Sequence, residues 1–120
     1  MTLKVVKPLE ISDAMLISTD VPEADYADWS TGITYALGDR VIVAAEHKVY
    51  ESLQAGNLNN AVSNPLWWIV VSPTNRWKLF DASNSTQTAQ ASGSMSYVLR
   101  PQSAVSALAA LNLNNATAIR

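Results

Sequence analysis

The side chains that could carry out chemistry are few in this sequence. His47 is the one imidazole among 120 residues, and no Gly-x-Ser-x-Gly motif supplies a nucleophile for it to activate. We therefore interpret His47 as an exposed turn histidine. Asp25 and Asp28 are three residues apart, and a solvated acidic helix start explains them better than a glycosidase carboxylate pair. With one histidine and no cysteine, we expect no metal, no cofactor and no enzymatic activity.

Composition describes a small folded protein without the features of a nucleic-acid or membrane protein. Hydrophobic residues make up 48% and charged residues 15%, and the net charge is −2. That is enough apolar material for one domain, or for one small domain and part of another. The charges form no basic run and no stretch of about 20 apolar residues occurs, so we expect neither nucleic acid nor membrane as a partner. The first residues lack the apolar region of a signal peptide, and we expect synthesis in a cytoplasm.

Aromatic residues form the most informative group. Candidates for binding a carbohydrate or a partner are Trp29, Tyr35, Tyr50, Trp67 and Trp68. In a small β-domain several of them must form the core, because few other large side chains are available. Trp67 and Trp68 are adjacent, so on a strand they point to opposite faces, one buried and the other exposed or covered by a partner. An exposed tryptophan can anchor an interface or stack on a sugar ring, so core, interface and sugar interpretations all stay open.

Short elements are expected before residue 40. Residues 3–6 and 14–19 are rich in aliphatic and β-branched side chains and predict two short strands. A proline with acidic neighbours, typical of a helix start, predicts one or two helical turns over residues 24–29. Gly38 and Asp39 then predict a structural turn in which the carboxylate accepts backbone N–H groups.

The middle of the chain predicts a hairpin and a third strand. Residues 40–45 and 49–53 read as antiparallel strands with His47 near the tip between them. Residues 55–65 are rich in asparagine, serine, glycine and proline and predict a loop. Residues 67–71 predict the third strand, so the first part of the chain is expected to be a small β-domain.

A change of composition at residue 82 predicts a domain boundary. Residues 83–94 carry no charge and no large apolar side chain, which is typical of a loop or linker. Beyond it, residues 95–99 alternate and predict a strand. Residues 104–113 carry aliphatic side chains at spacings of three, which also suits a helix, but their small apolar residues and the asparagine cluster over residues 112–115 favour a strand. About 40 residues cannot bury a core of their own. We therefore expect a β-domain over residues 1–81, and a segment over residues 82–120 that packs on a partner or opens a β-sandwich.

A wider pattern joins the aromatic residues to the turn. It consists of Trp29-x5-Tyr35-x2-Gly38-Asp39-x-Val41, Tyr50-x-Ser52, Asn64-Pro65 and Trp67-Trp68. This pattern resembles the small chitin-binding module (carbohydrate-binding module family 5/12) that is appended to bacterial chitinases, and the resemblance covers residues 28–70. It implies a compact, twisted three-stranded β-domain whose exposed aromatic side chains stack on polysaccharide.

The segment that follows resembles a more specific group of proteins. Residues 73–81 (Pro-Thr-Asn-Arg-Trp-Lys-Leu-Phe-Asp), after Trp67 and Trp68, are similar to uncharacterised tail and baseplate proteins of long-tailed bacteriophages. In those chains such a module precedes a larger β-sandwich, which would begin near residues 86–88 here. The resemblance implies a virion protein that is assembled in the host cytoplasm, with other tail or baseplate proteins as partners.

These expectations are compatible with functions of different classes. The first is a structural virion protein of a phage tail tip or baseplate, acting as a protein–protein adaptor, with its own copies in a symmetric particle as further partners. The alternative is a carbohydrate-binding module that attaches to host-surface polysaccharide, with Trp29, Tyr35 and Trp68 as stacking surfaces. A third is an accessory domain of a polysaccharide-degrading enzyme, which requires a catalytic domain outside the given chain. For all of them the expected fold is mostly β: a small twisted three-stranded domain, then a partner-completed β-segment or the start of a β-sandwich.

Overall fold

The computed structural model shows a mostly β protein built from short elements. The structure describes residues 2–3, 5, 7–91, 93–111, 113–114, 116 and 118. In chain order the elements are η1 (Asp13–Met15), β1 (Leu16–Thr19), β2 (Thr34–Tyr35), β3 (Arg40–Val43), η2 (Ala44–Glu46), β4 (Lys48–Ser52), β5 (Asn57–Leu58), β6 (Trp68–Pro73), η3 (Lys78–Phe80) and β7 (Tyr97–Leu99), where η marks a single 3₁₀ turn. Within the described residues, no helix is long and apolar enough to cross a membrane.

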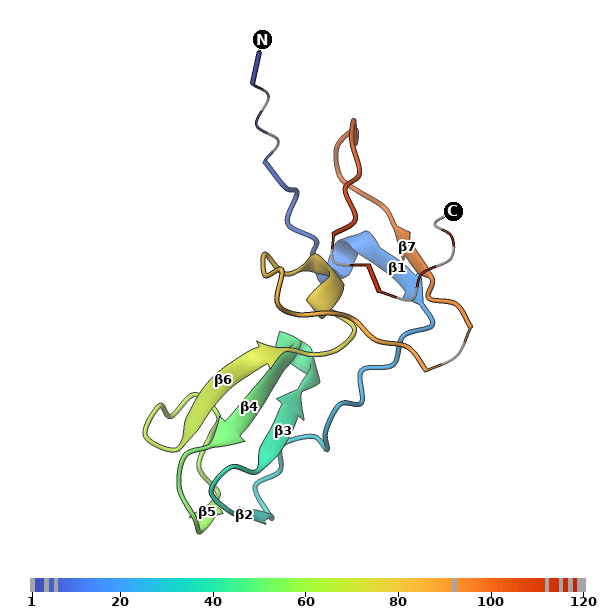
Figure 1. Ribbon diagram of the computed structural model, residues 1–120. Coiled ribbons are helices and arrows are strands. Elements are labelled where there is room, and N and C mark those ends of the chain that lie inside the picture. Colours follow the sequence, from blue (N-terminus) through green and yellow to red (C-terminus); the bar gives the residue numbers. More distant parts are fainter. Residues whose placement is uncertain are drawn as a thin grey trace.

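The largest sheet has the order β3-β4-β6 and is antiparallel throughout. Val41 lies opposite Tyr50, and Trp68 lies opposite Ser52 on the other side of β4. β-Branched and aromatic side chains fit such a pleated, half-buried surface, which is why these segments form strands. The sheet confirms the predicted hairpin and the predicted third strand, with ends shifted by a few residues (Figure 1).

The tip of the hairpin is a 3₁₀ turn that His47 closes. Its backbone N–H donates to the carbonyl of Ala44 at 3.2 Å, and its φ of 56° places it in the left-handed region. Non-glycine residues seldom adopt that conformation. The carbonyl of His47 then accepts the N–H of Thr74 at 2.9 Å, so the tip is also bonded to the residue that follows β6.

Residues 24–29 form no helix, so the helical turns predicted there are wrong. Asp28 forms a parallel bridge with Ile42 of β3. The N–H of Trp29 donates to the carbonyl of Ile42, and the N–H of Ile42 donates to the carbonyl of Ala27, both at 3.0 Å. Backbone groups that a helix would have bonded to one another within the segment therefore bond to the edge of β3 instead.

The loop predicted over residues 55–65 contains one short strand. β5 pairs antiparallel with β2, which places Tyr35 opposite Asn57. The amide of Asn57 is fully buried and donates to the hydroxyl of Ser52 at 2.9 Å. A buried polar side chain that is bonded in this way fixes the loop against the end of β4.

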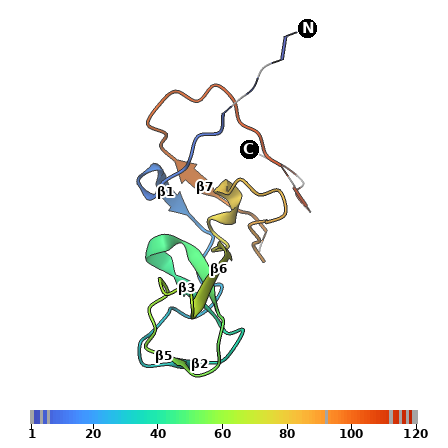
Figure 2. The same cartoon turned by 90° about the vertical axis from the view of Figure 1, so that its left-hand side faces the viewer.

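The C-terminal part of the described chain pairs with its N-terminal part. β7 is antiparallel to β1, with Leu16 opposite Leu99 and Thr19 opposite Tyr97, and this confirms the strands predicted over residues 14–19 and 95–99. The strand pair lies at one end of the molecule, with the three-stranded sheet at the other and η3 between them (Figures 1 and 2). The partner of β7 is thus in the same chain. The domain boundary at residue 82 stays a prediction, and the strand pair crosses it.

Two other predicted strands do not form in the part of the chain that the structure describes. Residues 104–111 and 113 have no regular structure and are exposed, so the strand predicted over residues 104–113 is wrong there. No neighbouring strand bonds to them, and an isolated strand leaves its backbone groups to water. Leu3 and Val5 likewise lie in no strand, while residues 4, 6 and 112 lie outside the described residues.

One apolar cluster forms the core of the three-stranded sheet. It contains Tyr35, Val41, Tyr50 and Trp68, each buried. The rings of Tyr35 and Trp68 meet edge to face, with centroids 5.1 Å apart. The indole N–H of Trp68 donates to the carbonyl of Asn60 at 2.9 Å, so the ring is buried without an unpaired donor.

We expect Trp68→Ala to lower the free energy of unfolding by about 3–5 kcal/mol, because the change removes the largest buried side chain of this cluster and leaves a cavity. The measurement is urea-induced unfolding followed by circular dichroism. Leu66→Ala, two residues earlier and 71% exposed, is the control and should change stability by less than about 0.5 kcal/mol. Equal losses in the two variants would contradict the core assignment.

Candidate functional site

The five predicted aromatic residues lie together, but they form the apolar core and the side chains packed against it, not an open binding surface. Tyr35, Tyr50 and Trp68 are buried, and Trp29 and Trp67 are half-buried and pack against them. Stacking on a sugar needs an open ring face, so the expectation that Tyr35 and Trp68 present such faces is wrong. Of the two adjacent tryptophans, Trp68 is the one that points into the core.

The predicted turn at Gly38 and Asp39 has the geometry that the sequence indicated. Gly38 has a φ of 86°, which favours glycine. The Asp39 carboxylate accepts the N–H of Ala36 at 2.7 Å. The N–H of Gly38 donates to the carbonyl of Ser52 at 2.8 Å, so the turn is bonded to the end of β4.

Gly38→Ala should lower the free energy of unfolding by about 1–2 kcal/mol, because a Cβ makes the left-handed conformation costly. An added Cβ would meet no other atom within 4 Å, so the loss reports the backbone alone. The control is Gly32→Ala, whose backbone is not left-handed and whose nearest atom, Ser30 Oγ, lies 4.0 Å away. Thermal unfolding compares the two variants. A Gly38→Ala protein as stable as Gly32→Ala would refute the strain.

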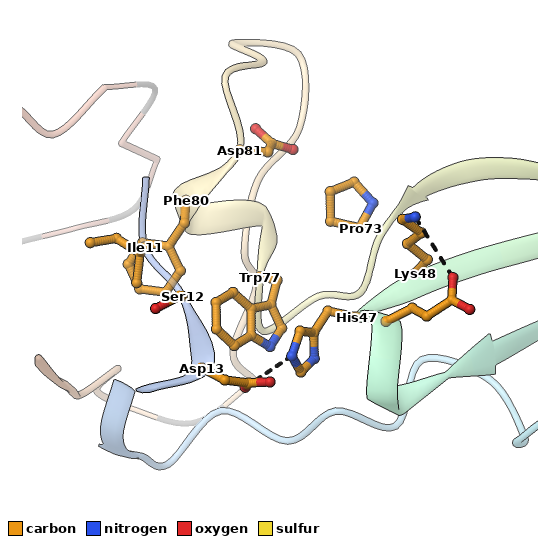
Figure 3. Close-up of a pocket in the computed structure, with 10 residues that line it drawn as sticks. Ile11, Ser12, Asp13, His47, Lys48, Pro73, Trp77, Phe80 and Asp81 are labelled. Carbon is orange, nitrogen blue, oxygen red and sulfur yellow. Dashed lines mark ion pairs between the residues drawn. The ribbon is translucent and has the colours of Figure 1, made fainter. Parts of the chain in front are cut away.

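A second cluster surrounds His47 and was not predicted. The imidazole stacks on the indole of Trp77, with ring centroids 4.1 Å apart and planes 24° apart. Nε2 lies 2.9 Å from Asp13 Oδ1 (Figure 3), and Nδ1 lies 3.0 Å from Glu23 Oε1. The side chain is only 22% exposed. The interpretation of His47 as an exposed turn residue is therefore wrong, because three separate segments cover the hairpin tip.

Glu23 is the centre of this cluster. Its side chain is 7% exposed, and Oε1 accepts the hydroxyl of Thr74 at 2.7 Å as well as facing His47. The guanidinium of Arg76 lies 3.4 Å from Oε2, and its Nε donates to the carbonyl of Val21 at 2.8 Å. The carboxylate thus joins the segment after β1, the hairpin tip and the segment after β6.

Aromatic rings continue from the cluster to the other end of the molecule. Trp77 and Phe80 meet edge to face with centroids 5.7 Å apart, and Phe80 and Tyr97 do the same at 5.3 Å. The hydroxyl of Tyr97 donates to the carbonyl of Arg76 at 2.7 Å. With the stacked His47, these rings connect the tip of the large sheet to β7.

The surroundings of His47 and of Tyr50 raise the pKa of each side chain. Partial burial lowers the pKa of His47, but its interactions with the carboxylates of Asp13 and Glu23 outweigh burial, so the net pKa is raised above 6.5. Burial and a hydrogen bond to Glu46 raise the pKa of Tyr50 to about 12. The phenol therefore keeps its proton, and the imidazole favours its charged form.

A shallow groove of about 290 Å³ opens beside the His47 cluster (Figure 3). Its walls are Ile11, Ser12, Asp13, Glu46, His47, Lys48, Pro73, Trp77, Phe80 and Asp81. The groove combines aromatic and aliphatic surface with charged groups at the rim. It lies between the N-terminal segment on one side and the hairpin tip with η3 on the other.

The carboxylates that could have formed a catalytic pair have structural contacts instead. Asp25 accepts the N–H of Asn75 at 2.7 Å and lies 3.9 Å from Lys78 Nζ, whereas Asp28 is exposed beside its bridge to β3. Among the described residues, no group of three histidine or acidic side chains lies close enough to hold a metal ion. The geometry of these groups is that of an ionic network that holds segments together.

Comparison of the chain with protein-family models, with curated proteins and with solved structures gives no match.

Glu23→Gln should lower the free energy of unfolding by about 3 kcal/mol, because it removes the charge that His47 and Arg76 face in a buried site. Chemical denaturation near pH 6 measures the change. Glu51→Gln is the matched control, since Glu51 pairs with Arg40 at 2.8 Å at the surface, where solvent and salt screen the pair and it contributes little to stability. A Glu23→Gln variant no less stable than Glu51→Gln would show that the buried network is not a major source of stability.

Proposed function

We propose that this chain is a structural virion protein of a long-tailed bacteriophage tail tip or baseplate, where it acts as a protein–protein adaptor. One observation carries the proposal: residues 101–119 contain no charged side chain, and the described part of this segment exposes large aliphatic groups. Exposed fractions reach 86% at Leu108 and 79% at Leu111. Several exposed large aliphatic side chains on one uncharged segment are typical of a site that another protein covers.

The free edge of β6 is a second surface with the same character. Among the residues that the structure describes, β6 has a strand neighbour on one side only, and Ile69, Val70 and Val71 are 49%, 47% and 39% exposed. Residues 66–75 carry no charge. Uncharged aliphatic strand edges are the ones to which another chain can add a strand. Docking through this edge would suit an adaptor.

The virion setting rests on the likeness of residues 73–81 to tail and baseplate proteins. It supplies the partners of the proposal: other tail or baseplate proteins, and copies of this chain within a symmetric particle. The burial of Tyr35, Tyr50 and Trp68 supports docking over polysaccharide binding, because a sugar platform would have only the half-buried Trp29 and Trp67 to use.

The test compares the full chain with the double variant Leu108→Ser, Leu111→Ser. We expect the full chain to self-associate as its concentration rises, because water-exposed aliphatic groups are buried in the complex. The double variant should self-associate much less and unfold at the same denaturant concentration as the parent, because both side chains lie outside the core. Sedimentation velocity over a wide concentration range measures the first effect, and urea denaturation measures the second.

Leu3→Ser is the control, since Leu3 is 88% exposed but lies outside the uncharged segment and is followed by a lysine in the sequence. It should associate like the parent. A parent chain that stays monomeric at every concentration would contradict the adaptor proposal. So would retention on insoluble chitin that is lost in a folded Trp29→Ala or Trp67→Ala variant, which would replace docking with polysaccharide binding.

A further inference from the structure

The contact between Asp13 and His47 closes the N-terminal segment onto the hairpin tip. Asp13 lies in η1, and its side chain is 72% exposed, unlike the 7% of Glu23. Both ring nitrogens of His47 face a carboxylate oxygen, at 2.9 Å and 3.0 Å. Nε2 makes no aligned hydrogen bond, so its contact with Asp13 is one of charge.

A neutral imidazole cannot serve both carboxylates. It carries one N–H, and its other nitrogen presents a lone pair. Nδ1 keeps its bond to Glu23, because that carboxylate is buried and held by Thr74 and Arg76. Nε2 then carries a lone pair in place of its N–H, and the ring without its positive charge no longer attracts the carboxylate of Asp13. The contact that must open is the one with the exposed Asp13.

Charged groups from several elements surround the imidazole. They are Asp13 of η1, Glu23 after β1, Glu46 of η2, Lys48 of β4, Arg76 after β6 and Asp81 after η3. Each of those other than Asp13 has a further partner of its own. Lys48 Nζ lies 3.7 Å from Glu46, and Asp81 accepts the hydroxyl of Thr86 at 2.6 Å. Asp13 is therefore the charge whose position depends most directly on His47.

The contacts of the chain after Asp13 limit how far such an opening extends. Met15 is buried, and its carbonyl accepts the N–H of Arg100 at 2.8 Å, so β1 and the pair that it forms with β7 hold the chain from that residue onward. Ile11, Ser12 and Asp13 line the groove together with Trp77 and Phe80 (Figure 3). Movement of residues 11–14 away from the hairpin tip would widen the groove and expose more of Trp77 to it.

We propose that residues 11–14 form a latch, which protonated His47 holds closed over Trp77 and which opens when His47 loses its proton. Because the pKa of His47 is raised in the folded state, the closed latch is more stable at low pH than at high pH. The closed latch and the stability that it contributes are fully present below about pH 6.5, the value of an unperturbed histidine. Both are lost as the pH rises through the higher pKa of the folded state. The latch is a property of this fold whether or not the chain is an adaptor.

Amide hydrogen exchange of the full chain tests the latch from about pH 5.5 to about pH 9. Protection factors remove the intrinsic pH dependence of exchange, and the ring resonances of His47 report its proton in the same samples. We expect the protection of the Met15 and Leu16 amides, which donate to the carbonyls of Ser12 and Asp13, to fall with the same midpoint as the deprotonation of His47, while β3 and β4 stay protected. Protection that does not change with pH, or changes with another midpoint, would overturn the proposal.

Two variants sharpen the test. Asp13→Asn keeps the shape of the side chain without its charge, so the Met15 and Leu16 amides should exchange rapidly at both ends of the range and His47 should titrate at lower pH. Glu10→Gln removes a carboxylate from the same segment outside the contact and should behave like the parent. His47→Asn tolerates the left-handed backbone and should leave the latch open at every pH. A parent-like pH response in Asp13→Asn or His47→Asn, with β3 and β4 protected, would refute the latch.

Discussion

A buried carboxylate is the constraint on which the rest of this structure depends. Glu23 is almost fully removed from water, and a charge in that environment must be met by donors and opposite charge. The hydroxyl of Thr74, the imidazole of His47 and the guanidinium of Arg76 meet it. These groups belong to the hairpin tip and to the chain after β6. The carboxylate therefore fixes both against the segment after β1.

The elements that could be predicted are those whose signal lies within a few neighbouring residues. Alternation marks β3 and β4, and a run of aromatic and β-branched side chains marks β6. Residues 24–29 could not be predicted in the same way. Their acidic and proline signal is local, whereas the bonds that hold them go to Ile42 of β3. A helix of two turns has little stability of its own, so the segment bonds to the available edge of β3 instead.

The same distinction between local and distant contacts applies to the candidate site. The aromatic residues could be predicted as a group and the turn at Gly38 and Asp39 in detail, because both follow from local spacing. The cluster at His47 could not, because its imidazole reaches Glu23 across 24 residues and Glu23 reaches Thr74 across 51. No periodicity relates such positions. Only the packing of the hairpin tip against two distant segments makes a turn histidine into a half-buried charge.

The latch and the apolar surfaces use different residues, and this separates proton binding from docking. Residues 11–14 and the hairpin tip form the latch, whereas the proposed docking surfaces are the edge of β6 and residues 101–119. A partner that covers only those surfaces meets the same side chains in either state of the latch, and its affinity has no reason to follow the proton on His47. Binding that weakens or strengthens as His47 titrates would therefore place the partner at the groove, in contact with Trp77 or with the latch itself.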